Sequence, residues 1–450
     1  MQNTRAPLQA LRVAAHFAQT RWWLNFRERS QLQAWQQKRL QHFLQTVVPR
    51  APRYRALHAQ TLAELPCMDK ALMMAHFADY NTRGVALEEA LSVALSAERS
   101  RDFSPQLGEL TVGLSSGTSG HRGLFLVSPE ERLRWAGILL ARALPTKLVG
   151  RLLSPWQPPL RVAFFLRANS NLYTTLISQR IDFRFFDLLH GLDSALPALQ
   201  ACQPDVLVAP ATVLGALAQH RLGEQLSITP QHIISVAEVL EAPDAAAVQA
   251  AFGQPAYPLY QATEGFLGYT CEAGTLHLNE SFIHIEPEWL DAEHTRFQPL
   301  ITDFSRHTQL IVRYRLNDVL RASATPCPCG RAERAIAAIE GRSDEVLWLP
   351  AQNDGSLVAI YPDLLRRSMV LAGPSIAQYT ITQEGQVWQV ALQAANNASQ
   401  QDAIQETRLA LDALWRQHGV RSAQLHFCDW QAPAPGAKRR RIQLKTKPER

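Results

Sequence analysis

The chain has 450 residues, of which 46% are hydrophobic and 19% are charged, a balance that is typical of folded proteins and excludes an intrinsically disordered one. A chain of this length is expected to form two or three domains. The 45 basic and 40 acidic residues leave a formal charge of +5, a mild excess that is concentrated at the two ends of the chain.

No stretch of the sequence is apolar over the ~18 residues that a membrane-spanning helix needs, and the first residues lack the apolar core of a signal peptide. The 6 cysteines are mostly scattered, unlike the framework of a disulfide-rich secreted protein. These features predict a cytoplasmic protein without a membrane span.

The first predicted element is helical, over residues 8–45, and combines arginines with aromatic residues such as Trp22 and Trp23. Such a helix suits a membrane surface or a nucleic acid. The favoured interpretation is an amphipathic helix that packs on its own domain. Helical spacing also predicts helices over residues 64–80 and 86–97.

A glycine-rich segment, Leu114 to Leu124, lies between a short apolar run and a helix that is predicted to begin near Ser128. Its three glycines allow close approach of the backbone to a ligand, and its four hydroxyls add donors, which suits a cradle for an anion such as a triphosphate. The spacing is that of neither the Walker loop nor the dinucleotide-binding loop. A surface loop of small residues is the alternative.

Beyond this segment, short apolar runs alternate with helical patterns. Strands are predicted at 161–168, 204–209 and 232–237, and helices at 195–201, 212–219 and 244–252. Apolar strands interleaved with helices favour a mainly parallel sheet that is covered on both faces, and therefore an α/β fold. From 282 to 315 the pattern changes to shorter strands separated by turn residues.

A polar break at Ile339–Asp344 separates this region from a last segment of roughly a hundred residues. That segment has its own predicted elements, which are strands at 377–382, 386–392 and 423–427 and a helix at 402–418. Its size and its mixture of elements predict a small α+β domain.

The first of three further groups of residues is Tyr260–Gly265, where an aromatic ring, a hydroxyl and a carboxylate lie close together in the sequence. The ring suits stacking on a base, Thr263 suits contact with a phosphate, and Glu264 suits a magnesium ion, which prefers carboxylate oxygen. An exposed Thr-Glu pair at the end of a strand is the alternative.

The second group belongs to the run Leu310–Val319. Arg313 and Arg315 are predicted to share one face of a strand, and Asp318 is predicted to lie just beyond its end. A carboxylate in this position can accept hydrogen bonds from both hydroxyls of a ribose. A pair of arginines that satisfies local carboxylates is an alternative of equal weight.

The third group consists of Cys271, His277, Cys327 and Cys329. Two of the thiols lie on one tight turn, and the third thiol and the imidazole lie on either side of a glycine-containing turn. Three thiols and one imidazole form a tetrahedral zinc set without an open coordination position, which predicts a structural zinc. The spacing is not that of a known zinc finger, and ordinary buried cysteines and histidines are the alternative.

Taken together and in this order, these motifs resemble the adenylate-forming (acyl-activating) superfamily, and most of all its phenylacetate–CoA ligase-like branch, which includes synthetases that adenylate a deazaflavin cofactor. The resemblance covers nearly the whole chain, and its most specific parts are Ser115–Gly120, Tyr260–Gly265, Val312–Arg315 and Gly341–Asp344. It implies an α/β fold with a large N-terminal domain, whose mixed and parallel sheets are flanked by helices, and a small mobile C-terminal α+β domain. The implied parts are 1–100 (helical), 101–342 (ATP- and acyl-binding) and 343–450 (the small domain).

The resemblance also implies which residues bind ATP and the acyl group. The phosphates would be wrapped by Ser115, Ser116, Gly117, Thr118, Ser119 and Gly120. The adenine and the acyl group would be lined by Ala237, Glu238, Tyr260, Gln261 and Ala262. Asp318 would bind the ribose hydroxyls, and Arg342 would contact the nucleotide.

The implied catalytic residues are Thr263, Glu264, Arg342 and Lys438. Thr263 would touch the α-phosphate, Glu264 would hold Mg²⁺, and Lys438 would stabilise charge during adenylation. Asp344 resembles the hinge about which the small domain rotates. Many members of this branch also share the thiols and imidazole, which are matched here by Cys271, His277, Cys327 and Cys329, followed by Arg331.

The implied activity is ATP-dependent activation of a carboxylic acid, aryl or other, as an acyl adenylate with release of pyrophosphate, followed by thioester formation with coenzyme A or a carrier protein. The alternatives are transfer of AMP to a non-carboxylate acceptor and a nucleotide-binding protein without catalysis, which includes one that uses its basic tail on nucleic acid. The expected ligands are ATP, Mg²⁺, a structural Zn²⁺ and a small carboxylate, with no nucleic acid. A homodimer is common in this branch.

The sequence departs from the usual pattern of the branch at several positions. His121 and Arg122 stand where many relatives have Lys-Pro, and Gln261 stands where a glycine is usual. Asn317 replaces the glycine before the ribose-binding Asp, and Glu345 stands where a second Asp is common. His121 and Gln261 argue against a standard phenylacetate-type substrate.

Overall fold

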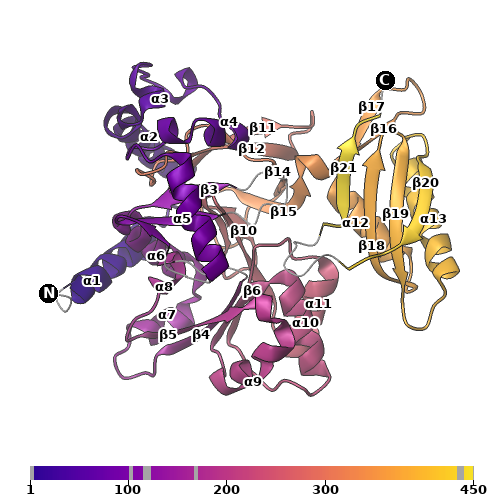
Figure 1. Ribbon diagram of the computed structural model, residues 1–450, viewed down its shortest axis with the longest axis horizontal. Helices are drawn as coiled ribbons and strands as arrows, with labels where there is room; N and C mark the ends of the chain where they lie inside the picture. The colour runs from indigo at the N-terminus through magenta and orange to yellow at the C-terminus, as the bar shows by residue number, and fades with distance from the viewer. Residues whose placement is uncertain (1–4, 101–104, 115–122, 167–170, 433–439, 449–450) are drawn as a thin grey trace. The chain divides into compact units, whose positions relative to one another are not determined.

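The computed structural model covers residues 1–450 and describes all of them except 1–4, 101–104, 115–122, 167–170, 433–439 and 449–450 (Figure 1). The chain forms two compact units. The first comprises Met1–Leu316 and Ala322–Ala338, and the second comprises Asn317–Arg321 and Ile339–Arg450. The second unit therefore takes up a short segment that precedes its main part in the sequence.

The N-terminal segment forms α1 (Arg5–Ala18), a π-helical turn (Gln19–Trp23) and α2 (Arg29–Thr46). The helix predicted over 8–45 is therefore interrupted. At the interruption, the Arg21 guanidinium donates hydrogen bonds of 3.1 Å to the main-chain oxygens of Ala141 and Leu144, at the end of α6 (Pro129–Ala143). These contacts tie the segment to its own unit, as the favoured interpretation predicted. None of the described helices combines the length and the hydropathy needed to cross a bilayer.

Short helices follow, namely α3 (Pro52–Arg55), α4 (Lys70–Ala75) and α5 (Leu87–Ser100). The helix predicted at 86–97 is confirmed as α5, but the one predicted over 64–80 is wrong at its start, because residues 65–69 are not helical. There the Met68 amide donates to the main-chain oxygen of Arg313 at 2.9 Å, and the Met68 oxygen accepts from the Arg315 amide at 2.7 Å. Long-range backbone hydrogen bonds thus replace a helical turn.

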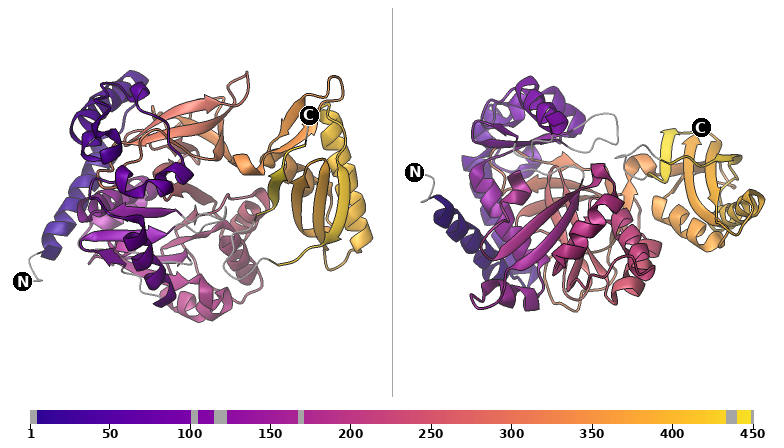
Figure 2. Two further views of the ribbon diagram at one scale, coloured as in Figure 1. Left: turned by 45° about the horizontal axis from the view of Figure 1, so that its top comes forward. Right: turned by 60° about the horizontal axis from the view of Figure 1, so that its bottom comes forward.

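A parallel part of the large sheet carries the predicted alternation of strands and helices (Figure 2). Across the sheet, its strands occur in the order β8 (Ala256–Ala262), β7 (His232–Val236), β6 (Val206–Pro210), β4 (Leu160–Leu166) and β5 (Ile181–Asp187). Along the chain, these strands are separated by helices that include α9 (Leu192–Cys202), α10 (Ala211–Leu222) and α11 (Ala242–Phe252). Leu207 of β6 packs in a cluster with Leu214 of α10, whereas Val206 and Val208 belong to a second cluster with Phe17 of α1. Both faces of the sheet are therefore covered, as the apolar strands predicted.

The same sheet continues with antiparallel strands after β8, which pairs parallel with β7 but antiparallel with β9 (Gly265–Thr270). Beyond β9 the order is β10 (Leu276–Leu278), β15 (Ala335–Arg342), β14 (Asp318–Ala322), β12 (Arg296–Asp303) and β11 (Ile283–Trp289), and β13 (Tyr314–Arg315) pairs with β12. In open α/β sheets, ligands bind beyond the carboxyl ends of the parallel strands. A ligand-binding site is therefore expected among the residues that follow β7 and β8.

Gly137 of α6 allows α1 to approach closely. A Cβ atom at this position would lie 2.6 Å from the Cβ of His16 and 2.7 Å from the main-chain oxygen of Val13. We expect Gly137→Ala to lower the free energy of unfolding by about 2 kcal/mol, because overpacking outweighs the better helix propensity of alanine. Urea unfolding measures this, with Gly150→Ala in α7 (Thr146–Leu153) as the matched control, since a Cβ there meets nothing within 4 Å. An unchanged midpoint for Gly137→Ala would contradict this packing of α1.

The second unit contains a sheet in the order β20 (Gln424–Asp429), β19 (Val387–Ala394), β18 (Ile376–Glu384) and β21 (Ile442–Thr446). Trp388 of β19 packs in its core against Trp415 of α13 (Gln400–Gln417), with ring centroids 5.8 Å apart. The predicted strands and helix of this segment are confirmed as β18, β19, β20 and α13. Three further parts of this unit were not predicted from the sequence. They are β21, which follows a run of basic residues, the hairpin of β16 (Leu347–Pro350) and β17 (Leu357–Ile360), and helix α12 (Pro362–Ala372).

Candidate functional site

Paired strands hold both ends of the predicted phosphate loop. The loop residues Ser115, Ser116, Gly117, Thr118, Ser119 and Gly120 lie outside the described residues, as does Lys438. On either side, β2 (Leu110–Leu114) and β3 (Leu124–Val127) pair antiparallel, with Leu114 opposite Leu124. Strand β3 leads directly into α6, whose start is fixed by reciprocal hydrogen bonds between Ser128 and Glu131.

Thr263 and Glu264 form the turn between β8 and β9, where the sheet changes from parallel to antiparallel. The Tyr314 hydroxyl donates to Glu264 Oε1 at 2.8 Å. Arg306 Nη1 donates to the main-chain oxygens of Thr263 and Glu264 at 3.0 and 3.2 Å, and its Nη2 donates to the oxygen of Leu126 at 3.1 Å. One guanidinium therefore joins the Thr-Glu turn to the strand that follows the glycine-rich segment.

Arg306 and Tyr314 were not identified as site residues from the sequence. Arg306 is buried at 8% exposure and faces Glu131. Burial opposes ionisation of Glu131, but the charge of Arg306 and the hydroxyls of Ser128 and Thr308 lower its pKa overall. An arginine in a turn between two strands carries no pattern that distinguishes it from a surface arginine, so the sequence offered no signal for this role.

Ala237 and Glu238 follow β7 at the same edge of the sheet. Ala237 has a φ of +66°, a left-handed conformation that costs a residue with a Cβ atom about 1 kcal/mol. Glu238 Oε2 accepts hydrogen bonds from the amide and the hydroxyl of Thr212 at 3.1 and 2.8 Å, at the start of α10. The other predicted adenine- and acyl-binding residues end the neighbouring strand β8, and they are Tyr260, Gln261 and Ala262. The two predicted segments therefore follow adjacent parallel strands.

In the second unit, Asp318 and Arg342 lie close together, with 3.9 Å between Asp318 Oδ1 and Arg342 Nε. Asp344 Oδ2 accepts a hydrogen bond of 2.9 Å from Arg440 Nη2. Gly341, which precedes Arg342, has a φ of +123°, and a Cβ atom there would lie 2.5 Å from Glu345 Oε2. The Gly-Arg-Ser-Asp motif therefore needs its glycine for a backbone conformation that other residues rarely adopt.

The arginines of the Arg-Tyr-Arg run pair with carboxylates of β11. Arg313 Nε lies 3.1 Å from Glu286 Oε1, and Arg315 Nη2 lies 2.6 Å from Glu288 Oε1. Arg313 has a φ of +45° and precedes β13, so the regular strand predicted for both arginines is wrong. The alternative, in which the two arginines pair with nearby carboxylates, is the one that the structure shows. Tyr314, which lies between them in the sequence, contacts Glu264.

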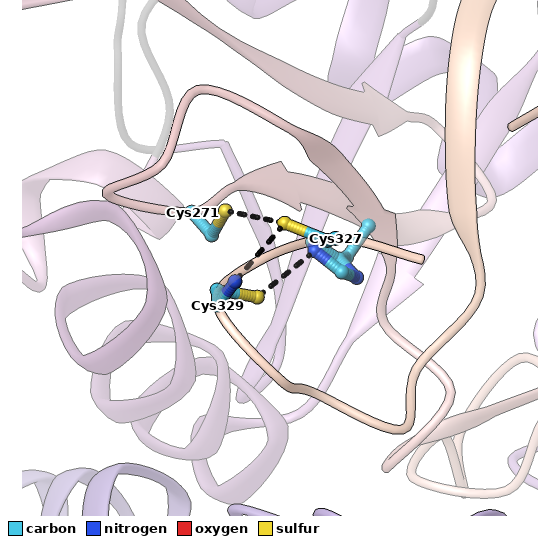
Figure 3. A group of neighbouring side chains, drawn as sticks. Cys271, Cys327 and Cys329 are labelled. Carbon is cyan, nitrogen blue, oxygen red and sulfur yellow. Dashed lines mark hydrogen bonds between the residues drawn. The ribbon is translucent and has the colours of Figure 1, made fainter. Parts of the chain in front are cut away.

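The structure brings Cys271, His277, Cys327 and Cys329 together, as the sequence predicted, with one donor atom of each within 4.8 Å of the others. Cys271 Sγ lies 3.6 Å from Cys327 Sγ (Figure 3). Cys329 Sγ lies 3.3 Å from His277 Nε2. Zinc binds such ligands at ~2.0–2.3 Å, so that ligand atoms of one tetrahedral site lie roughly 3.3–3.8 Å apart. These two separations match that geometry.

Hydrogen bonding prepares these side chains for a metal ion. His277 Nδ1 donates to the main-chain oxygen of Glu333 at 2.9 Å. Burial opposes ionisation of Cys271, but interactions with His277 and the Thr275 backbone lower the pKa of its thiol to about 6. Burial likewise opposes the charge of His277, but Cys271 raises its pKa to about 9. These shifts favour a thiolate at Cys271 beside a protonated imidazole at His277, and binding of a metal ion by the imidazole would release its proton.

No protein-family model matches the chain, and no curated protein matches it. Among solved structures, 2-hydroxyisobutyryl-CoA ligase in its postadenylation state is similar with a TM-score of 0.64 at 16% identity, covering 90% of this chain and 88% of that one. An open conformation of that ligase, in complex with 2-HIB-AMP and CoA, gives a TM-score of 0.54 at 14% identity, with 90% of both chains covered. The acyl acid amido synthetase GH3.15 gives 0.53 at 12% identity, covering 86% of this chain and 84% of that one. At these identities the likeness is one of fold, and it extends over nearly the whole chain.

Proposed function

We propose that this chain, which has the fold of the adenylate-forming ligases, activates a carboxylic acid with ATP as an acyl adenylate and then transfers the acyl group to a thiol such as that of coenzyme A. The observation that carries the proposal is the likeness to a ligase in its postadenylation state over 90% of this chain. The Thr263–Glu264 turn and the Asp318–Arg342 pair support it, because they offer the groups that this chemistry requires.

In the first step, a carboxylate oxygen of the acid attacks the α-phosphorus of ATP. The new bond joins that oxygen to phosphorus, the bond to the bridging oxygen of the β-phosphate breaks, and pyrophosphate leaves with the electron pair. Such a transfer depends on positioning and on charge stabilisation more than on covalent catalysis. Thr263 would contact the α-phosphate, Asp318 would accept the ribose hydroxyls beside Arg342, and Lys438 would stabilise the developing charge.

Glu264 fits a Mg²⁺ ion that accompanies ATP. Its carboxylate offers the hard oxygen ligand that this ion prefers. Tyr314 holds Oε1 at 2.8 Å, and no hydrogen bond from the described part of the chain reaches Oε2. The bound ion would neutralise phosphate charge in the transition state. Arg306 fixes the backbone of the same turn and thereby keeps the Glu264 side chain pointing in one direction. In this proposal Arg306 itself does not touch the reacting atoms.

We also propose that Cys271, His277, Cys327 and Cys329 hold a structural zinc ion. The set supplies all the ligands of a tetrahedral site and leaves no position for substrate. The hydrogen bond from His277 Nδ1 to Glu333 supports the proposal, since metal-binding histidines usually donate their other ring nitrogen to a fixed acceptor.

ATP–pyrophosphate exchange with Mg²⁺, across a panel of aryl, branched aliphatic, fatty and amino acids, tests the activity. Exchange that depends on one class of acid is the expected result and identifies the substrate class. Exchange with no acid, together with measurable ATP binding, would contradict carboxylate activation and favour AMP transfer to another acceptor. Absence of ATP binding would overturn the proposal altogether.

A second candidate acceptor is an amine, which the likeness to an acyl acid amido synthetase favours. Once an acid is identified, incubation with coenzyme A, with a carrier protein or with a mixture of amino acids separates the acceptors, because thioesters react with hydroxylamine at neutral pH and amides do not. A hydroxylamine-sensitive product with coenzyme A is expected.

A further inference from the structure

A buried ion pair, Arg142 and Glu333, lies next to the four metal-site side chains, since the main chain of Glu333 contacts His277. The side chains of Arg142 and Glu333 are only 1% and 3% exposed, and Arg142 Nη2 lies 2.8 Å from Glu333 Oε1. Burying two charges carries a large desolvation penalty, which is offset only where hydrogen bonds satisfy both partners. The chemistry proposed for adenylation uses neither residue, so their burial calls for a different explanation.

Glu333 is held from three directions. The Ser281 hydroxyl donates to Oε1 at 2.6 Å, from the loop after β10, and the Tyr269 hydroxyl of β9 donates to Oε2. Arg142 reaches the carboxylate from α6, and its guanidinium also lies 4.6 Å from the centre of the Tyr269 ring. These contacts restrict the Glu333 side chain to one orientation. Because the side chain is held, the main chain of Glu333 is held as well.

The main chain of the same residue contacts the metal site, because the Glu333 oxygen accepts from His277 Nδ1 at 2.9 Å. A carbonyl can only accept, so it selects the tautomer whose Nε2 is free to bind a metal. Tyr269 lies directly opposite His277 in the pairing of β9 with β10, and their ring centroids are 6.2 Å apart. Glu333 and Tyr269 together therefore define where the imidazole lies.

The charges around the site also balance. Three thiolates on a divalent ion leave one negative charge. Arg331 lies 5.5 Å from the centre of the Tyr269 ring, and its Nη1 is 4.0 Å from Glu333 Oε2. Arg142 offsets the charge of Glu333, and Arg331, which interacts electrostatically with Cys271 and Cys329, can offset the charge of the metal cluster. A neutral group of this kind is less costly to bury than the metal cluster alone.

We propose that Glu333, fixed by Arg142 and Tyr269, is a positioning residue for metal binding, which holds His277 in the orientation and tautomer that the metal requires. This inference rests on the proposed zinc site. It explains why a full ion pair is buried at this place, and it links the metal site to α6, the helix that begins just after the glycine-rich segment and β3.

The test is the affinity of the full chain for zinc, measured by competition with a chromophoric chelator. Glu333→Gln keeps the size of the side chain but removes its charge, and it is expected to raise the dissociation constant for zinc by about tenfold to a hundredfold. Asp205→Asn is the matched control, since Asp205 is also 3% exposed and lies 2.8 Å from its partner Arg151. The control should leave the dissociation constant for zinc unchanged.

Unfolding with and without zinc separates positioning from a merely structural role. If Glu333→Gln lowers the stability of both forms equally, the dissociation constant is unchanged and the inference is overturned. If this variant does not fold, Tyr269→Phe decides in its place: a severalfold weaker affinity supports the inference, and a wild-type affinity overturns it. A wild-type chain that binds no zinc would overturn both the inference and the zinc proposal, whereas zinc binding by the wild type with unaffected variants overturns the inference alone.

Discussion

Replacing Glu264 by glutamine is expected to lower the rate of ATP–pyrophosphate exchange by roughly a thousandfold. Glutamine preserves the shape of the side chain and an oxygen that can accept from Tyr314, but it removes the negative charge that a Mg²⁺ ion needs. The hydrogen bonds from Arg306 go to main-chain oxygens, so the turn should keep its conformation. The lower exchange rate is therefore expected to result from the missing negative charge and not from a change in structure.

Exchange rates at several Mg²⁺ concentrations check this expectation. Glu264→Gln should need more Mg²⁺ for half its maximal rate, whereas Glu130→Gln, which alters an exposed ion pair with Arg12, should behave as the wild type. Both variants should unfold at the same temperature as the wild type. A Glu264→Gln rate within tenfold of the wild type, at every Mg²⁺ concentration, would show that another group holds the ion.

The overall fold could be predicted because it depends on features that are local in the sequence. The parallel strands β4, β6 and β7 are apolar runs with helices near them in the sequence, and the motifs resemble those of a superfamily of ligases, which agrees with the likeness in fold to 2-hydroxyisobutyryl-CoA ligase. The segment 64–80, which was predicted as one helix, is not determined by its local pattern. Its first residues have a helical pattern, but their backbone groups bond to Arg313 and Arg315, which no local pattern reveals.

The candidate site also contains residues that could be predicted from the sequence and residues that could not. The grouping of Cys271, His277, Cys327 and Cys329 was predicted although Cys271 and Cys327 are far apart in the sequence, because cysteines are rare and their chemistry is distinctive. The partners that hold the site were missed, because arginine and glutamate are common residues on any surface. Arg142 and Glu333 form their pair across 191 positions, and Arg306 reaches Leu126 across 180. Only the folded chain reveals that these particular residues are buried together.

Replacing both Cys327 and Cys329 by serine is expected to abolish zinc binding and to lower the free energy of unfolding by about 4 kcal/mol, the stabilisation that an ion supplies when it is present at a thousandfold above its dissociation constant. Serine hydroxyls are poor zinc ligands, so the two remaining groups, Cys271 and His277, cannot retain the ion. Unfolding with and without a chelator measures the effect: the wild type should lose stability to the chelator, and the double variant should not respond. Cys202→Ser alters a thiol that is 1% exposed and lies outside the cluster, so it should respond to the chelator as the wild type does.

The same double variant distinguishes a structural zinc from a catalytic one. Strand β9 begins directly after Glu264 and ends directly before Cys271, so one strand connects the proposed zinc ligands to the Thr263–Glu264 turn. Because Arg306 and Tyr314 hold that turn independently of the metal, protein that is still folded at low temperature should keep its ATP–pyrophosphate exchange within about tenfold of the wild type. Loss of exchange in fully folded, zinc-free protein would contradict a structural role, since the ion would then take part in the reaction itself. If the variant loses stability but retains exchange, the zinc has a structural role. This is the role that a closed set of four ligands predicts.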